Sequence, residues 1–149
     1  MSSYIGDRLR RLVAQRANRL CEYCLIAEDD TYLGCEVDHI ISEKHGGPTN
    51  AENLAYACAP CNRAKGSDVG SIAGGTERFS RFFNPRIDRW ADHFALDGDV
   101  IVPRTEIGDV TARILALNTP MRVAERMELR LAGRYPSPAA RRHIAASLD

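Results

Sequence analysis

Apolar residues at helical spacing open the chain. Leu9, Leu12, Val13 and Leu20 recur with a period close to that of an α-helix, and arginines occupy the other faces. The segment 7–20 is therefore predicted to be an amphipathic helix. It ends at the first of two cysteine pairs.

The spacing of apolar residues then changes to one typical of strands. Residues 34–42 (GCEVDHIIS) and 54–58 (LAYAC) are short apolar runs separated by a turn-rich loop, and they predict two strands. Pro60 stands where proline is favoured at a helix start, and Gly66 is a natural stop, so a short helix is expected after the second strand. The expected local order is strand, loop, strand, helix.

The second half of the chain begins with a glycine-rich segment. Four of the eleven glycines lie within 66–76, which predicts a flexible boundary between a core (residues 1–66) and a C-terminal α+β extension (residues 67–149) packed on it. Further on, an Asp-Gly pair between apolar runs predicts a hairpin over 94–102. Three helices are expected, the last two with Thr119 and Ser137 as N-caps, at 106–117, 120–132 and 138–148.

Length and composition are those of a single ordinary globular unit. The chain has 149 residues, of which 44% are hydrophobic and 27% charged, and this excludes collagen-like and disordered chains. No apolar run reaches the roughly 18 residues that cross a bilayer, and arginines stand where a signal peptide would have its apolar core. We therefore expect a cytoplasmic protein with no membrane partner.

The charges balance overall but are unevenly distributed. Twenty basic residues offset twenty acidic ones, so the basic excess typical of nucleic-acid-binding proteins is missing. Basic residues nevertheless dominate residues 1–20 and 63–89, on either side of an acidic stretch over 22–52. These two basic stretches predict a phosphate-binding face, and solvated arginines on helix faces are the alternative for each side chain taken singly.

Four of the five cysteines form two Cys-x-x-Cys pairs, Cys21 with Cys24 and Cys58 with Cys61. In a reducing compartment this pattern favours metal ligation over disulfides, and four thiolates complete a closed, structural zinc site. The zinc would join the end of the first helix to the start of the short one. Four buried free thiols are the alternative. Cys35 lacks a partner at this spacing and is expected to be a small buried residue.

The segment between the cysteine pairs carries a second set of polar residues. Asp38 and His39 are adjacent in the first predicted strand, Asn53 follows in the loop, and Asn62 comes directly after the last cysteine. With the two Cys-x-x-Cys pairs, the DHI triplet, the GG-x-x-N-x-x-N loop and the N-R-x-K-G run, residues 20–66 resemble the HNH endonucleases, which are ββα-metal nucleases. The implied fold class is α+β, a ββα-metal core with a structural zinc site. Asn62 departs from the family name, since histidine would be its last letter.

Phosphodiester hydrolysis requires a base that deprotonates water and a cation that stabilises charge on the phosphate. His39 suits the base, because imidazole titrates near neutral pH, and the oxygens of Asp38 and Asn62 suit Mg²⁺ or a similar divalent cation better than zinc. The resemblance implies that these residues cut DNA, leaving a 5′-phosphate and a 3′-hydroxyl, in a restriction, defence or mobile-element setting. It also implies that Asn53 ties the loop to the hairpin and orients the His39 ring. Asn50 competes with Asn53 for that role.

Three further residues are candidates for contact with a substrate phosphate. Arg63 and Lys65 follow Asn62 on the short helix. His45 lies on the loop between the two predicted strands, directly before two glycines. Solvated side chains are the alternative for all three. The aromatic run over 82–94 is expected to clamp the C-terminal part rather than to stack on bases. One active site per chain implies nicking, or double-strand cleavage by a homodimer.

Two questions stay open at the level of the sequence. In a regular strand Asp38 and His39 point to opposite faces, so the strand must twist, bulge or end there if both serve one site. In addition, the same residues taken singly fit ordinary structural roles. The alternatives to a nuclease are a zinc-ribbon module that binds nucleic acid or protein without catalysis, and a protein-interaction adaptor, which the zero net charge would suit.

Overall fold

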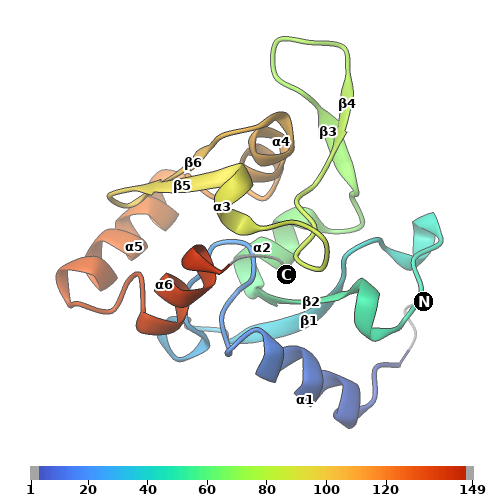
Figure 1. Ribbon diagram of the computed structural model, residues 1–149, viewed down its shortest axis with the longest axis horizontal. Coiled ribbons are helices and arrows are strands. Elements are labelled where there is room, and N and C mark those ends of the chain that lie inside the picture. Colours follow the sequence, from blue (N-terminus) through green and yellow to red (C-terminus); the bar gives the residue numbers. More distant parts are fainter. Residues whose placement is uncertain (1–3, 147–149) are drawn as a thin grey trace.

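The first half of the chain folds as a helix, a two-stranded sheet and a second helix. The computed structural model describes residues 4–146. In it α1 (Asp7–Arg16) precedes the antiparallel strands β1 (Cys35–His39) and β2 (Leu54–Cys58), and α2 (Ala59–Lys65) follows directly. In Figure 1 α1 lies below the two strands and α2 above them. The expected order of strand, loop, strand and helix is confirmed, as is the α+β class.

The first helix is shorter than the predicted segment 7–20. Asn18 and Arg19 adopt φ angles of +52° and +54°, a left-handed conformation in which a right-handed helix cannot continue. The chain therefore turns back on itself, and Leu20 pairs with Ala27 in an isolated bridge. The first cysteine pair lies within this turn.

The two strands differ in their environment. β2 is buried along its whole length, whereas the residues of β1 are half-buried or exposed. Val13 and Ala14 of α1 pack against Leu54 and Tyr56 of β2 in a small core of their own. Because the sheet has two strands, β1 forms an open edge, and its last residue, His39, pairs with Leu54.

The glycine-rich segment 66–76, for which the composition predicts a flexible boundary, includes a short strand. It contains β3 (Gly70–Ile72), which pairs with β4 (Phe79–Arg81) in a hairpin that projects from the molecule (Figure 1). Two of the three residues of β3 are glycine and serine, so the strand has no apolar pattern from which it could be recognised. Its pairing rests on backbone hydrogen bonds and on Arg113, whose guanidinium donates to the Ile72 carbonyl.

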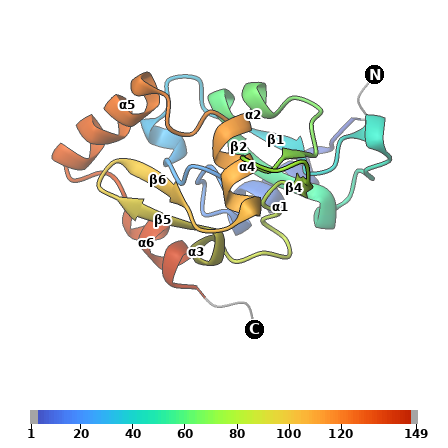
Figure 2. The same cartoon turned by 90° about the horizontal axis from the view of Figure 1, so that it is seen from above.

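The remaining elements follow the sequence-based expectations closely. A single turn of helix, α3 (Trp90–His93), leads into the predicted hairpin of β5 (Phe94–Asp97) and β6 (Val100–Pro103). Three helices follow: α4 (Glu106–Ile114), α5 (Pro120–Leu131) and α6 (Pro138–Ala145). Figure 2 shows α5 and α6 on the side of the molecule away from the loop between β1 and β2.

The predicted caps behave differently from one another. Ser137 accepts a hydrogen bond from the Ala140 amide at 3.1 Å and caps α6. Thr119 occupies the N-cap position of α5, but its side chain makes no capping hydrogen bond. The predicted end of the last helix, at residue 148, lies outside the described residues.

One hydrophobic core runs through both halves of the chain. Buried residues around the two cysteine pairs pack with buried residues from the aromatic run, from β6, from α4 and α6, and from the chain that follows α4 and α5, among them Phe83, Trp90, Ile101, Leu117 and Tyr135. The core is thus continuous across the sequence boundary at residue 66. Within residues 4–146, no helix has both the length and the apolar character needed to span a membrane.

Candidate active site

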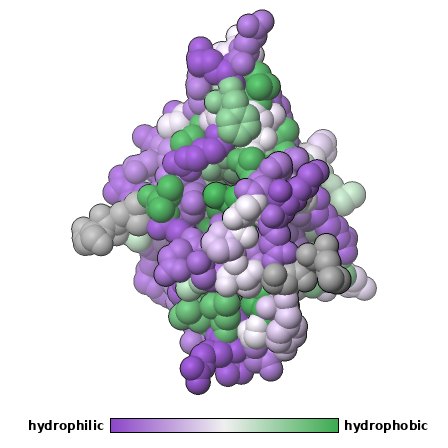
Figure 3. Space-filling model, turned by 90° about the vertical axis from the view of Figure 1, so that its right-hand side faces the viewer, coloured by the Kyte–Doolittle hydropathy of each residue, from purple (hydrophilic) through white to green (hydrophobic). Residues whose placement is uncertain are grey.

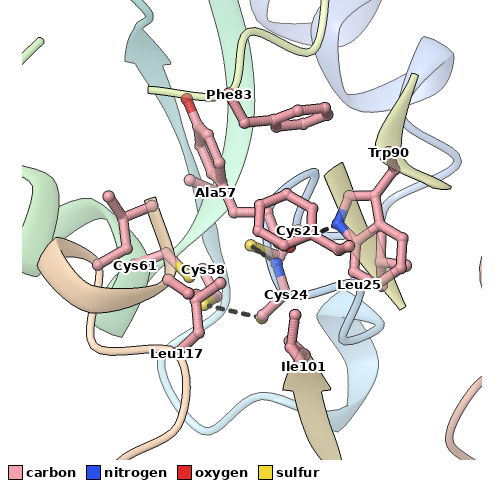
Figure 4. Packing of buried hydrophobic residues seen from close by; sticks show 14 of the residues in the cluster. Cys21, Cys24, Leu25, Ala57, Cys58, Cys61, Phe83, Trp90, Ile101 and Leu117 are labelled. Atoms are coloured by element: carbon pink, nitrogen blue, oxygen red, sulfur yellow. Dashed lines mark hydrogen bonds between the residues drawn. The ribbon is translucent and has the colours of Figure 1, made fainter. Parts of the chain in front are cut away.

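The four paired cysteines converge on one point. The sulfurs of Cys21, Cys24, Cys58 and Cys61 are buried and all lie within 4.8 Å of one another. Cys24 and Cys58 face each other with their sulfurs 3.7 Å apart (Figure 4). A disulfide requires about 2.05 Å, whereas a tetrahedron with Zn–S bonds of about 2.3 Å has edges of about 3.8 Å. The donors and their spacing therefore fit a structural zinc ion. Cys35 is half-buried on β1 and lies outside this cluster.

The thiols of the cluster affect one another's protonation. Hydrogen bonding with Cys21 lowers the pKa of Cys24, and hydrogen bonding with the same neighbour raises the pKa of Cys58. Burial raises the pKa of Cys61. Four buried thiolates cannot form together without a compensating cation, so a divalent cation and folding of this region are coupled.

An arginine from the C-terminal half contacts two of these sulfurs. Nη2 of Arg122, on α5, lies 3.0 Å from Sγ of Cys61 and 3.7 Å from Sγ of Cys58. Burial acts to lower the pKa of Arg122, but the neighbouring thiols raise it above its ordinary value. A four-thiolate zinc site carries a net negative charge, which this guanidinium partly balances. Arg122 follows Cys61 by 61 residues, and no local pattern in the sequence pointed to it.

The C-terminal half also holds the turn of the first cysteine pair. Arg86 forms an ion pair with the buried Glu22, and the indole of Trp90 donates to the Tyr23 carbonyl at 2.9 Å. The hydroxyl of Tyr135 donates to the carbonyl of Cys24 at 2.8 Å. Three consecutive residues of this turn are thus each bound by a side chain from beyond residue 80.

The aromatic run is part of this clamp, as predicted. Its large rings are all buried. The ring of Phe94 lies 5.5 Å from that of Phe83 and 5.1 Å from that of Trp90, centroid to centroid. Phe83, Trp90 and Phe94 are each only 1% exposed, so these three rings are not available to stack on a base.

Asp38 and His39, at the end of β1, line one shallow open pocket of about 260 Å³. The pairing of β1 with β2 is regular through His39, and the chain then leaves the sheet and forms a short 3-10 turn over Glu43–His45. Asp38 and His39 line the same pocket although neighbouring side chains of a regular strand point to opposite faces of the sheet, and His39 is the last residue of β1. The other lining residues are Ser42, Glu43, Lys44, Gly66 and Ser67.

The His39 ring is held by residues that the sequence did not single out. Its Nε2 lies 2.8 Å from Oγ1 of Thr49 and 3.6 Å from Oε1 of Glu43. Thr49 donates its own hydroxyl proton to Oε1 of Glu43 at 3.1 Å. The threonine oxygen is then the acceptor for His39, so Nε2 carries the ring proton and Nδ1 presents the lone pair. This tautomer follows from the hydrogen-bond network.

Asp38 is paired with a buried lysine. Nζ of Lys65 lies 2.9 Å from Oδ2 of Asp38 and donates to the His39 carbonyl at 2.8 Å. Burial raises the pKa of the Asp38 carboxyl, and the adjacent ammonium opposes that rise. The Lys65 side chain is only 1% exposed. Lys65 is therefore not a solvated side chain, which was the alternative to phosphate contact. Its ammonium is directed at Asp38 rather than outward toward a phosphate.

Asn53 makes the contacts expected of a residue that ties the loop to the hairpin. Its Oδ1 accepts from the Ile41 amide, and its Nδ2 donates to the carbonyls of Ile41 and Pro48, all at 2.9 Å. Gly47 permits this close packing, because a Cβ there would lie 1.7 Å from the Ile41 carbonyl oxygen. Asn50, the competing candidate, is exposed on the surface.

The remaining candidates lie around this pocket rather than in it. Asn62, on α2, donates its amide to the carboxylate of Glu36, two residues before Asp38 on the same face of β1. Asn62 does not line the pocket of Asp38 and His39. Arg63 is exposed on the next position of α2, and His45 is exposed at the end of the 3-10 turn.

This arrangement defines a class: a ββα core with a cluster of four cysteines, able to hold a structural metal ion, that joins the turn after α1 to β2 and α2. The family model described as HNH endonuclease matches residues 21–68, a span that contains both cysteine pairs, Asp38, His39, Asn53 and Asn62. The resemblance inferred from the sequence is confirmed over this segment, which matches the HNH endonuclease family model and covers about a third of the chain. No curated protein matches the chain.

Proposed function

We propose that the protein is a DNA endonuclease that hydrolyses phosphodiester bonds with one divalent cation and with His39 as general base. The observation that supports this most is the position of His39, whose ring is held by Thr49 at 2.8 Å beside Asp38 in the same open pocket. The HNH family match supports a nucleic-acid substrate. The zinc site folds the core and takes no part in the reaction.

His39 acts through Nδ1. Because Nε2 donates to Thr49, which in turn donates to Glu43, the lone pair on Nδ1 is available to take a proton from water. Glu43 also favours the charged imidazolium that forms, since its carboxylate lies 3.6 Å from Nε2. Fixing the ring in advance removes the cost of orienting it during the reaction.

Asp38 would hold the catalytic cation, with Asn62, which lies beside this pocket rather than in it, as the second ligand that the resemblance implies. Their donors, a carboxylate oxygen and an amide oxygen, fit Mg²⁺ or a similar hard ion. Such an ion supplies charge stabilisation on the phosphate and the leaving oxygen. Lys65 occupies Oδ2 of Asp38 and leaves the other oxygen for the ion. We therefore assign Lys65 to positioning Asp38, and retain Arg63 and His45 as candidates for phosphate contact.

Further contacts with the DNA backbone are assigned to the first basic stretch, and in the second stretch to Arg63 alone. Arg10 and Arg11 of α1 line a groove of about 280 Å³ beside Glu36 of β1. Arg19 lines the same groove but is paired with Glu28. In the second stretch the arginines are largely neutralised by acidic partners, among them the ion pairs Arg78–Glu106, Arg81–Asp88, Arg86–Glu22 and Arg89–Asp92.

The experiment that tests the proposal is cleavage of supercoiled plasmid in Mg²⁺ by the wild-type protein and by His39→Ala. Loss of a general base lowers the rate by about 10²–10⁴-fold, so we expect nicked or linear product from the wild type and almost none from the variant. Zinc content and circular dichroism of the two proteins serve as the folding control. Intact plasmid with both proteins, despite bound zinc, would contradict the proposal.

The two non-catalytic alternatives separate in a binding experiment. A zinc-ribbon module would bind duplex DNA equally well with and without His39, and its affinity would fall steeply with salt because phosphate contacts release counterions. A protein adaptor would show no binding to titrate. Cleavage of both strands in one binding event, seen as linear plasmid without a nicked intermediate, would require two active sites and hence a homodimer, which sedimentation would detect. A role in restriction, defence or mobile elements is the setting that the family resemblance implies, and the cytoplasm is the compartment that the sequence predicts.

A further inference from the structure

A second pocket adjoins the proposed active site. It encloses about 270 Å³, and apolar side chains form most of its wall, with polar groups at the rim. In the space-filling view (Figure 3), apolar surface is exposed below the hairpin at the top of the molecule. The residues that matter here are Ile40, Ile41, Phe79 and Phe82 in the wall, and His45 and Arg81 at the rim.

One short segment of chain separates this pocket from the active site. Between residues 38 and 45, Asp38, His39 and Glu43 line the active-site pocket, whereas Ile41 and His45 line the apolar one. A nucleotide joins a phosphate to an apolar, planar base through a single sugar. A strand that places its phosphate beside His39 therefore brings the attached base within reach of the second pocket.

The ring of Phe79, on β4, has the properties of a stacking platform. It is 60% exposed, although large apolar side chains are usually buried. One side of the ring lies against Gly70 of the paired strand, where a Cβ would come within 2.5 Å of Phe79 Cζ. A ring that is held on one side and open on the other can stack on a base with little loss of side-chain entropy.

The rim of the pocket offers a second planar group. Arg81 forms two parallel bonds to Asp88, at 2.7 and 2.9 Å, which hold its guanidinium in one orientation. A guanidinium plane stacks on nucleobases as an aromatic ring does. His45 adds a hydrogen-bonding group next to the apolar wall.

We propose that this pocket receives one unpaired nucleobase of the strand that is cut, stacked on Phe79. The inference rests on the proposed function and specifies its substrate: DNA in which a base near the scissile phosphate is unpaired or easily extruded, as in single strands, flaps, bulges and mismatches. A paired base cannot enter, because it is stacked within the duplex.

The test uses single-stranded DNA that contains one 2-aminopurine, whose fluorescence is quenched on stacking. Binding is measured with the zinc-bound protein and without added Mg²⁺, so that no cleavage occurs. We expect quenching with the wild type and with Phe79→Tyr, and affinity weaker by roughly five- to hundredfold, without quenching, for Phe79→Ala. Ile72→Ala is the matched control, because Ile72 pairs with Phe79 across the hairpin, is 46% exposed and does not line the pocket. Equal affinity and quenching in Phe79→Ala would overturn the inference.

A parallel cleavage experiment separates this inference from the proposed function. Matched duplex and the same duplex with one unpaired nucleotide are incubated with Mg²⁺, and we expect faster cutting next to the unpaired nucleotide. Cleavage of both at one rate, unaffected by Phe79→Ala, would leave the nuclease standing and refute the base pocket. Quenching that depends on Phe79 without cleavage of any DNA would refute the nuclease and leave the base pocket standing.

Discussion

At the scale of single residues, the ring of His39 depends on Thr49. We expect Thr49→Val, which removes the hydroxyl and keeps the shape, to slow single-turnover cleavage by about tenfold or more, because Nε2 loses its acceptor and the ring its fixed tautomer. The control is Thr49→Ser, which keeps the hydroxyl and should retain most of the rate. Wild-type cleavage by Thr49→Val would show that the ring is oriented in some other way.

Lys65 provides a second prediction at this scale. Lys65→Met removes the partner of Asp38, whose side chain is only 13% exposed, and breaking such a buried pair costs about 3–5 kcal/mol of unfolding free energy. Urea denaturation measures the loss. The double variant Asp38→Asn with Lys65→Met should recover part of it, since no charge is then left without a partner. A single variant as stable as the wild type would contradict the pairing.

The sequence identifies these residues unevenly. Asp38, His39 and Asn53 are recognisable because the motif places them at fixed spacings around the hairpin. Thr49 and Glu43 belong to the intervening loop, and their contacts depend on how that loop folds back over His39. Roles that require a neighbour in space cannot be recognised from spacing alone.

At the scale of elements, α5 is connected to the zinc site through Arg122. We expect Arg122→Met to release zinc about 10–100-fold more readily to a chromogenic chelator, because the thiolates lose a charged hydrogen-bond donor. Arg126→Met is the matched control on the same helix, since Arg126 is buried but bonds to the Asp99 carbonyl and to Asn118 instead. Equal zinc release from the two variants would contradict a specific role for Arg122.

The elements themselves were predictable where hydrophobic patterning is strong. β2 and the β5–β6 hairpin have clear apolar runs bounded by turns, and both occur as expected. The sequence does not predict β3, because its small residues give no apolar pattern. It predicts too long a first helix, because Leu20 continues the apolar spacing although the backbone has already turned at Asn18.

At the scale of the whole molecule, we expect removal of zinc to unfold the core and the C-terminal half together. The protein has one tryptophan, and Trp90 is buried with its indole on the first cysteine turn. Removal of zinc by a strong chelator is therefore expected to change tryptophan fluorescence and far-UV circular dichroism in one coincident transition. Unchanged Trp90 emission in a protein shown to have lost its zinc would mean that the C-terminal half folds independently.

The composition of the chain suggests two separate parts, before and after residue 66, but one continuous core joins them. Residues 66–76 are rich in glycine, as linkers are, but side chains from later in the chain contact the two cysteine pairs and the turn between Cys21 and Cys24 over separations of 61 to 111 residues. Long-range contacts of this kind leave no trace in local composition.

The most direct test of the account is the Mg²⁺ dependence of single-turnover DNA cleavage by zinc-bound wild type, His39→Ala, Asp38→Ala and Asn62→Ala. If His39 is the base and the other two hold the cation, His39→Ala lowers the maximal rate at saturating Mg²⁺. Asp38→Ala and Asn62→Ala would instead raise the concentration of Mg²⁺ that gives half of the maximal rate. Cleavage by His39→Ala at the wild-type rate, or no dependence on Mg²⁺ in any of the four proteins, would contradict it.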